Sequence, residues 1–196
     1  MNKYSQILDL LRTYDYLGKK EYPDGAALVG QAPHIAPLAW LHKIFAPLPN
    51  GQIQQLEATL RVKIPEDYKA FLKVSNGLGV FQKMNLYGYR SNYQRTVEAA
   101  QVQPFDILRP NIWERPSIAE PHGFYIGGYT AGNGAWIYLD ANDSTMHLCE
   151  RSQATSRYHW ESFVDFLGSE INRLMPLFDK EGKLLSPNID ILAINL

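Results

Sequence analysis

Apolar residues recur at helical spacing in three segments of the chain. The first segment covers residues 2–17, where Gly18 is suited to end a helix. The second covers residues 52–61, with Asn50 as the expected N-cap. The third covers residues 160–174 and has the most regular stripe. Each pattern predicts an amphipathic helix with one face on a core.

The segment at residues 63–77, KIPEDYKAFLKVSNG, predicts a further helix with clear signals at both ends. Pro65 suits the first helical position, where its missing N–H would have had no partner. Glu66 and Asp67 place negative charge at the positive end of the helix dipole. The Asn-Gly pair at 76–77 tolerates the left-handed backbone of helix ends. A structural role therefore accounts for all of these residues.

The remaining segments carry weaker patterns. Residues 19–37 read as an irregular connection and residues 38–45 as a short helix. Residues 80–89 are strand-like, and residues 92–101 fit a short helix. Residues 104–123 contain four prolines and are expected to be mostly loop.

Three short runs, 124–126, 135–139 and 145–150, are separated by glycine-rich or Asp/Asn-rich turns and predict an antiparallel meander. Strands do not alternate with helices as they do in a parallel sheet. We therefore expect an α+β fold, with a largely antiparallel or mixed sheet and helices packed mainly on one face. We expect a single domain over 1–196. It divides into an N-terminal helical extension (1–49), a core (50–174) and an extended C-terminal tail (175–196).

Strand alternation predicts two different faces for this meander. One face is apolar and suits a helical cover. The opposite face carries aromatic side chains with polar tips, a composition enriched at protein interfaces. Its members are Tyr125, Trp136, Tyr138 and His147, which we predict to form a protein-binding surface. The alternative is that the N-terminal helices or the C-terminal tail lie over this face.

Composition limits the range of functions. Nineteen basic and 20 acidic residues give a net charge of -1, which argues against direct nucleic-acid binding. The single Cys149 excludes an intrachain disulfide and a cysteine-based zinc site. Charges and tyrosines interrupt the apolar positions near the N-terminus, so we expect no signal peptide. No apolar run approaches the ~20 residues of a membrane span, and we expect a cytoplasmic protein.

Candidate chemistry is sparse. The glycine-rich stretch at 126–134 lacks the lysine of a phosphate-binding loop and precedes a strand, so a turn is the better interpretation. The segment from Asp140 lacks a calcium loop's glycine, since Thr145 holds that position, and Arg151 stands where its glutamate is required. The five histidines show no metal-binding spacing. We predict no catalytic, cofactor-binding or metal-binding residue, and a hydrolase with dispersed acids and histidines remains as an alternative.

Three blocks, at 53–77, 124–140 and 160–174, are similar to the SUKH superfamily, which contains the fungal Smi/Knr cell-wall regulators and many bacterial immunity proteins. The first block resembles the family's helix, Ile-Pro, acidic pair with Tyr, and helix ending at Asn-Gly. The second resembles its Ile-Gly strand, glycine-bearing turn and strand closed by Asp. The residues that match, and that are implied to specify the fold, include Pro65, Asp67, Tyr68, Phe71, Asn76, Gly77, Gly127, Gly134 and Asp140.

The resemblance implies an α+β domain that recognises other proteins and has no shared catalytic set. It favours a bacterial immunity protein that blocks a polymorphic or contact-delivered toxin, such as a secreted nuclease. The net charge of -1 favours shape and aromatic anchors over mimicry of nucleic acid. One alternative is a regulatory scaffold resembling the fungal members. Homodimerisation through the apolar C-terminal tail is compatible with any of these functions.

Overall fold

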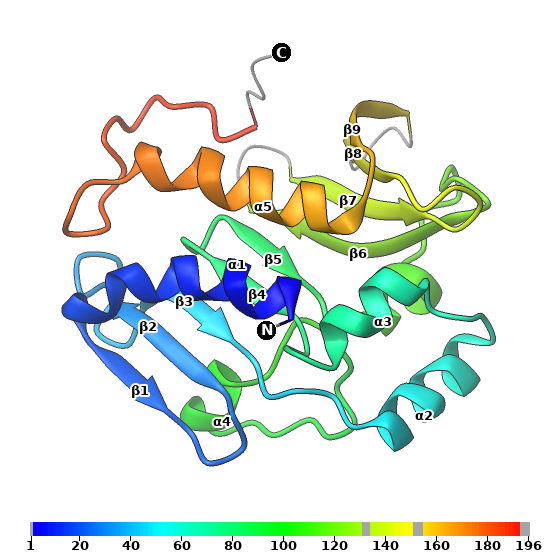
Figure 1. Ribbon diagram of the computed structural model, residues 1–196, viewed down its shortest axis with the longest axis horizontal. Helices are drawn as coiled ribbons and strands as arrows, with labels where there is room; N and C mark the ends of the chain where they lie inside the picture. The colour runs from blue at the N-terminus through cyan, green and yellow to red at the C-terminus, as the bar shows by residue number, and fades with distance from the viewer. Residues whose placement is uncertain (1, 131–133, 151–154, 193–196) are drawn as a thin grey trace.

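One antiparallel sheet of nine strands runs through the computed structural model, which describes residues 2–130, 134–150 and 155–192 (Figure 1). Each strand pairs with its neighbours in chain order, so the sheet is a continuous meander from β1 to β9. The strands are β1 (Lys19–Glu21), β2 (Ala27–Gln31), β3 (Trp40–Ile44), β4 (Leu78–Val80), β5 (Met84–Leu86), β6 (Gly123–Tyr129), β7 (Ala135–Asp140), β8 (Met146–Glu150) and β9 (Ser156–Trp160). This confirms the α+β class and the predicted meander over β6 to β8.

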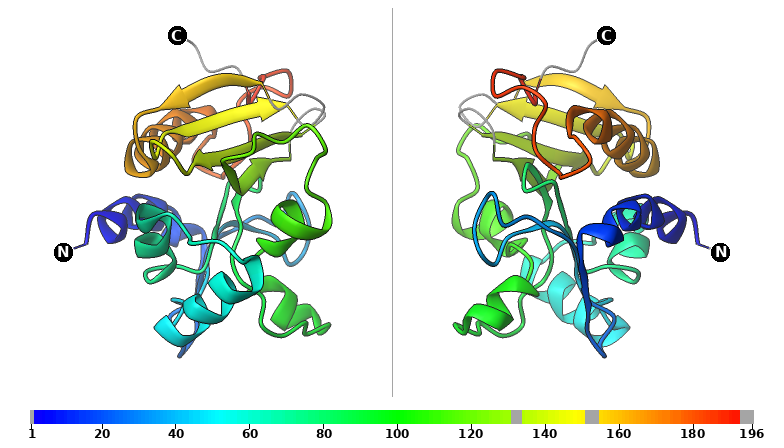
Figure 2. Two further views of the ribbon diagram at one scale, coloured as in Figure 1. Left: turned by 90° about the vertical axis from the view of Figure 1, so that its right-hand side faces the viewer. Right: turned by 90° about the vertical axis from the view of Figure 1, so that its left-hand side faces the viewer.

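Helices cover the two faces of the sheet unequally. The α-helices are α1 (Lys3–Leu11), α2 (Asn50–Leu60), α3 (Glu66–Leu72), α4 (Val97–Gln101) and α5 (Phe163–Leu174). Short 3-10 helices, η1 (Arg12–Leu17) and η3 (Met175–Leu177), extend α1 and α5, and η2 (Arg109–Trp113) is a single π-helical turn. In Figure 2, α1, α3 and α5 lie on one side of the sheet, and α4 and η2 lie on the other. We call these the helical face and the second face.

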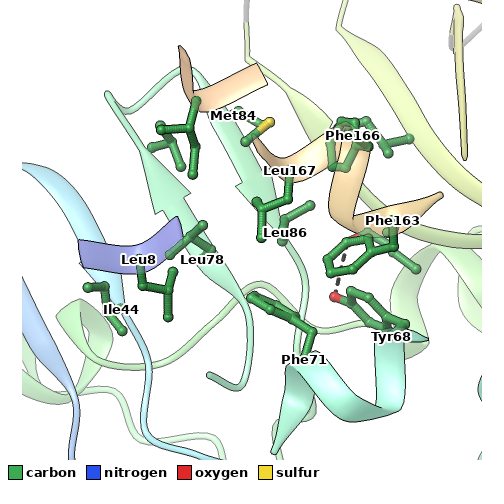
Figure 3. Packing of buried hydrophobic residues seen from close by; sticks show 14 of the residues in the cluster. Leu8, Ile44, Tyr68, Phe71, Leu78, Met84, Leu86, Phe163, Phe166 and Leu167 are labelled. Atoms are coloured by element: carbon green, nitrogen blue, oxygen red, sulfur yellow. Dashed lines mark hydrogen bonds between the residues drawn. The ribbon is translucent and has the colours of Figure 1, made fainter. Parts of the chain in front are cut away.

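The main core lies between the helical face and its three helices. Figure 3 shows Tyr68 and Phe71 of α3 packed beneath Phe163 of α5, with ring centroids 5.2 Å and 5.1 Å from Phe163. Tyr4 of α1 joins them, 5.7 Å from Phe163. All four rings are buried. Burial of each such side chain stabilises the fold by ~1.5–3 kcal/mol, which explains why the helical apolar stripes of the sequence become the core.

Residues of the 63–77 motif hold different helices and strands together through hydrogen bonds and close packing. The Tyr68 hydroxyl donates to the backbone oxygen of Tyr87, beyond β5. Asp67 accepts from Lys3 at 3.2 Å, which ties α3 to α1. Gly77 has φ +98°, and a Cβ there would lie 2.7 Å from the Leu86 backbone oxygen, so only glycine fits.

The second block of matched residues lies in the meander. A Cβ on Gly127 would lie 2.4 Å from the Asn85 backbone oxygen, so β5 and β6 approach closely only because glycine is present. Gly134 directly precedes β7. Asp140 ends β7, and its side chain accepts from the backbone N–H of Asn142 at 2.8 Å to form the following turn.

Three predicted helix ends are wrong in detail. Pro65 is the N-cap of α3 rather than its first residue, and Pro49 rather than Asn50 caps α2. Helix α3 ends at Leu72, before the Asn-Gly pair, because the chain must turn there to enter β4. Asn76 is therefore free of the helix and has another role, described below.

The N-terminal region contains the largest errors of prediction. The expected irregular connection at 19–37 contains β1 and β2, and the expected helix at 38–45 is β3. The apolar spacing of 38–45 fits a helix. The segment nevertheless forms a strand, because its backbone pairs with β2 on one side and β4 on the other. The expected helical extension thus contributes three strands to the common sheet.

The C-terminal region differs at one point. Trp160 belongs to β9, which was not predicted, and α5 begins at Phe163. The Ser162 hydroxyl caps α5 by accepting from the N–H of Asp165 at 3.2 Å. The tail lies against the body: Phe178 stacks on Phe81 at 4.0 Å, and Ile191 is buried. In the described part of the chain, no helix has the length and apolar character to span a bilayer.

Candidate functional site

The long segment that connects β5 to β6 in the sequence crosses the second face of the sheet. We call residues 88–122, which include α4 and η2, the cover segment. Its first residue, Gly88, forms a parallel bridge to a later part of the same segment. The Gly88 N–H donates to the backbone oxygen of Phe105 at 2.8 Å, and the Ile107 N–H donates to the backbone oxygen of Gly88 at 2.9 Å. The Asn76 side chain fixes the same point, because it donates to the backbone oxygen of Tyr89 at 2.9 Å and accepts from its N–H at 2.8 Å.

Asn111 fixes the other end of the cover segment to the sheet. Its side-chain oxygen accepts from the N–H of Tyr125 at 3.0 Å, and its nitrogen donates to the Tyr125 oxygen at 2.7 Å. The nitrogen also donates to the Ile107 oxygen at 2.8 Å, within the cover segment. Pairing between β5 and β6 begins only at Gly127, so Asn111 takes the place of a strand beside Tyr125.

The cover segment explains the positions of the four predicted binding residues. Tyr125 and Tyr138 are buried with Cys149 in a small second core, against which Ala119 and Trp136 pack. Burial raises the pKa of Tyr125 to about 12. Among the described residues, neither the N-terminal helices nor the C-terminal tail contributes to this second core. Trp136 and His147 are half-buried and keep exposed area, so contact with a partner remains a prediction for these two residues.

A cleft of about 750 Å³ lies between the cover segment and strands β5 to β7. Gly128 is part of its wall, and a Cβ at this position would lie 2.6 Å from the Ala135 backbone oxygen and 3.2 Å from the Tyr87 hydroxyl, so a larger residue does not fit there. The sheet side is lined by Asn85, Tyr87, Gly128, Tyr129, Thr130, Gly134 and Trp136. The cover segment contributes Arg90, Tyr93, Phe105, Asp106, Arg109, Pro110, Trp113 and Glu114.

Three aromatic residues of the cleft are unusually exposed. Tyr93, Phe105 and Trp113 have 51%, 56% and 58% of their surface accessible, although large aromatic side chains are normally buried. Ile112, beside Trp113 in η2, is also exposed. Sequence reasoning missed this group, because Phe105, Ile112 and Trp113 lie in the expected loop at 104–123 and Tyr93 lies in the expected short helix at 92–101. The available signal was the presence of Phe105, Ile112 and Trp113 in a proline-rich segment without an amphipathic pattern.

The charged groups of the cleft are mostly paired with each other. Arg109 Nε lies 2.6 Å from Glu114 Oε2. Asp106 is buried and accepts from the Tyr93 hydroxyl and from the N–H of Leu108 at 3.0 Å. Burial and the neighbouring Asp106 carboxylate raise the pKa of Tyr93 to about 12, so its hydroxyl is a neutral donor.

Arg90 differs from the other charged residues of the cleft. Its guanidinium lies 4.5 Å from the centre of the Tyr93 ring and donates to the neutral side chain of Gln103. No acidic side chain of the described ranges lies within 4.0 Å of it, and its Nε is buried with no hydrogen-bond partner there. The cleft thus combines exposed aromatic surface with one guanidinium that lacks a carboxylate.

One hydrogen-bonded chain outside the cleft resembles catalytic machinery. The Thr145 hydroxyl lies 2.6 Å from Asp143 and 2.7 Å from His147 Nε2, and His147 Nδ1 lies 2.8 Å from the Ser156 hydroxyl. In a serine triad the carboxylate contacts the imidazole directly, whereas a threonine stands between them here. Ser156 also donates to the backbone oxygen of Tyr158 at 3.1 Å. The contact between His147 and Ser156 joins β8 to β9, and the others lie within the preceding turn, between that turn and β8, or within β9.

In the described ranges, no group of three or more His, Cys, Asp or Glu side chains is placed to bind a metal ion. The geometry of the cleft, with aromatic and guanidinium groups on a segment that side chains clamp to the sheet, suits recognition of another molecule.

Comparison with known proteins identifies the family. No curated protein gives a significant match. The sequence profile described as the SMI1/KNR4 family (SUKH-1) matches residues 47–169, more than half of the chain. The matched region runs from α2 into α5 and contains the whole cover segment and the cleft, whereas α1 and β1 to β3 precede it. The chain therefore belongs to the SMI1/KNR4 family (SUKH-1).

Proposed function

We propose that the protein is a non-enzymatic protein-binding module, and that it acts as an immunity protein that neutralises a cognate toxin by occlusion. Membership of the SUKH group supports a function in protein–protein interaction. The finer assignment to immunity rests on the bacterial members that the sequence resembles.

The observation that carries the proposal is the exposed aromatic rim of the cleft. Tyr93, Phe105 and Trp113 are held on a segment that side-chain clamps fix to the sheet. Trp, Tyr and Arg are the residues most often responsible for binding energy at protein interfaces. A segment anchored in this way presents these side chains with little loss of conformational entropy on binding.

The charge balance indicates how such a complex would form. A net charge of -1 gives little long-range attraction to a basic toxin, so shape and aromatic contacts are the expected source of affinity. A stable complex would bury on the order of 1,200–2,000 Å² in total. The cleft and its rim would form the centre of this interface.

The test is coexpression with each candidate toxin encoded by a neighbouring reading frame, read out as growth and as co-purification. We expect the wild-type protein to restore growth and to bind the toxin. The double variant Phe105→Ser/Trp113→Ser should weaken binding roughly 30-fold or more, as expected for interface hot spots. Both residues are more than half exposed, so the fold should be retained.

The matched control is Leu185→Ser, which removes an apolar side chain of 63% exposure from the C-terminal tail. It should bind as the wild type does. Full protection by the double variant would show that the cleft is not the interface. Recovery of the host's own proteins in place of a toxin would favour the regulatory scaffold.

A further inference from the structure

We infer, on the basis of the proposed function, that the cleft binds a segment of the partner protein in which an acidic residue lies beside an apolar one. Arg90 would bind the carboxylate, and the aromatic rim would bind the apolar side chain. The partner is thus identified by an acidic and apolar recognition segment.

Arg90 is the residue of the cleft whose hydrogen bonds a ligand would complete. Its guanidinium is held over the Tyr93 ring and by the Gln103 side chain, so its orientation is fixed before binding. Its buried Nε has no acceptor among the described residues. A buried N–H without an acceptor is unfavourable, and a carboxylate can accept from two guanidinium N–H groups at once.

The other charges of the cleft limit what the ligand can be. Arg109 is neutralised by Glu114, and the Asp106 oxygens are occupied by Tyr93 and Leu108. A phosphomonoester carries up to two negative charges and a nucleic-acid strand carries one at every nucleotide, so either would bring more negative charge to the two carboxylates of the cleft than a single acidic side chain does. One carboxylate, in contrast, matches Arg90, the guanidinium of the cleft that pairs with no acid among the described residues. Charge complementarity therefore favours an acidic peptide segment over a nucleic acid.

The exposed aromatic rim indicates that the ligand also carries an apolar side chain. Phe105 and Trp113 line the cleft and are more than half exposed. A cleft of about 750 Å³ accommodates a few side chains of a peptide. An aromatic or leucine side chain against these rings would bury apolar surface on both partners.

The probe is a library of random dodecapeptides displayed on phage and selected on the intact protein. We expect selected peptides to carry Asp or Glu within a few positions of Trp, Phe or Leu. The best peptide is then synthesised with its acid present and with the acid replaced by the corresponding amide. Titration should show that Arg90→Gln weakens binding of the acidic form about tenfold or more, and leaves binding of the amide form unchanged.

Two variants keep the measurement interpretable. Arg157→Gln removes an exposed arginine of β9, on another part of the sheet, and should bind the acidic peptide as the wild type does. Trp113→Ser should weaken both forms of the peptide. Circular dichroism on each variant checks that the fold is retained, and a charge exchange, Arg90→Glu with a lysine in place of the peptide's acid, should restore part of the binding that Arg90→Gln loses.

Three results would overturn the inference: no peptide selected, no enrichment of acids, or binding by Arg90→Gln within twofold of the wild type. Tighter, Arg90-dependent binding of a single-stranded RNA dodecamer would assign the cleft to nucleic acid instead. The toxin assay separates the two proposals. If the wild type and Arg90→Gln protect cells equally, the carboxylate contact is wrong and the immunity function stands. If the wild type neither protects nor binds, the immunity function is wrong and the peptide data are judged alone.

Discussion

His42 on β3 is a buried histidine in an aromatic environment. The Phe81 ring lies 4.4 Å away and the Tyr14 ring 5.4 Å away. Its Nδ1 accepts from the N–H of Phe81 at 3.4 Å, and no described residue bonds its Nε2. Burial lowers the pKa of His42 from 6.5 to about 3, since the imidazolium ion would be poorly solvated there. The folded protein therefore holds this imidazole neutral.

This histidine should make the protein sensitive to acid. Below pH 6.5 the unfolded chain binds a proton at His42 that the folded chain cannot bind until about pH 3. The free energy of unfolding should fall across this window by up to ~1.4 kcal/mol per pH unit from this group alone. Urea unfolding from pH 7.5 to 4, compared between wild type and His42→Phe, isolates the contribution, because other groups titrate in both proteins. The exposed His34→Gln is the control, and equal pH slopes in wild type and His42→Phe would contradict the assignment.

At the scale of elements, the cover segment depends on side-chain amides more than on regular structure. Its helix α4 has five residues and none of them is buried. Ile107 and Leu108 supply most of its deeply buried apolar surface near η2. The clamps from Asn76 and Asn111 satisfy backbone groups that no strand reaches, so they decide where the segment lies.

Asn111→Ala should release η2 from the sheet. The substitution removes three hydrogen bonds, each with a net contribution of ~0.5–1.5 kcal/mol, and should destabilise the protein by about 2–4 kcal/mol. Faster hydrogen exchange at the Tyr125 amide is the local readout. Asn111→Asp keeps the acceptor for this amide, but it places a carboxylate oxygen against the Ile107 and Tyr125 carbonyl oxygens, so it should destabilise the protein at least as much as Asn111→Ala. Unchanged exchange and melting temperature in Asn111→Ala would rule out this role.

At the scale of the whole molecule, the sheet joins residues inside and outside the family match. β3 pairs with β4 through Ile44 and Leu78, although the match begins only at residue 47. Helix α1 packs on α5 and α3 by way of Tyr4 and its neighbours. The N-terminal residues therefore belong to the same core as the family region.

Deletion of residues 1–46 should thus prevent cooperative folding. It would remove β1 to β3, expose the edge of β4 and uncover the apolar faces of α3 and α5. Calorimetry should show a lost or strongly broadened unfolding transition relative to the full chain. A truncated protein with a sharp transition at the same temperature would mean that the N-terminal strands are an independent attachment.

The sequence by itself determined the helices and strands that are specified by their own apolar periodicity and flanking turn residues. The apolar stripes of α1, α2 and α5 repeat over two or more turns, and β6 to β8 are bounded by clear turn residues. The α+β class and the family resemblance followed from these segments. Asp67, Tyr68 and Phe71 were singled out there as framework residues, and each has a packing or hydrogen-bonding role in the fold.

Only the tertiary structure decided the rest. Strands β1 and β9 have three and five residues with little apolar alternation, and they become strands because a neighbour supplies their hydrogen bonds. The burial of Tyr125 and Tyr138, and the cleft beside them, depend on where the cover segment lies. Its position is fixed by hydrogen bonds from the Asn76 and Asn111 side chains to the backbones of Tyr89 and Tyr125, 13 and 14 positions further along the chain. A side-chain amide that pairs with a distant backbone leaves no periodic pattern, so the functional surface becomes visible only when the chain is folded.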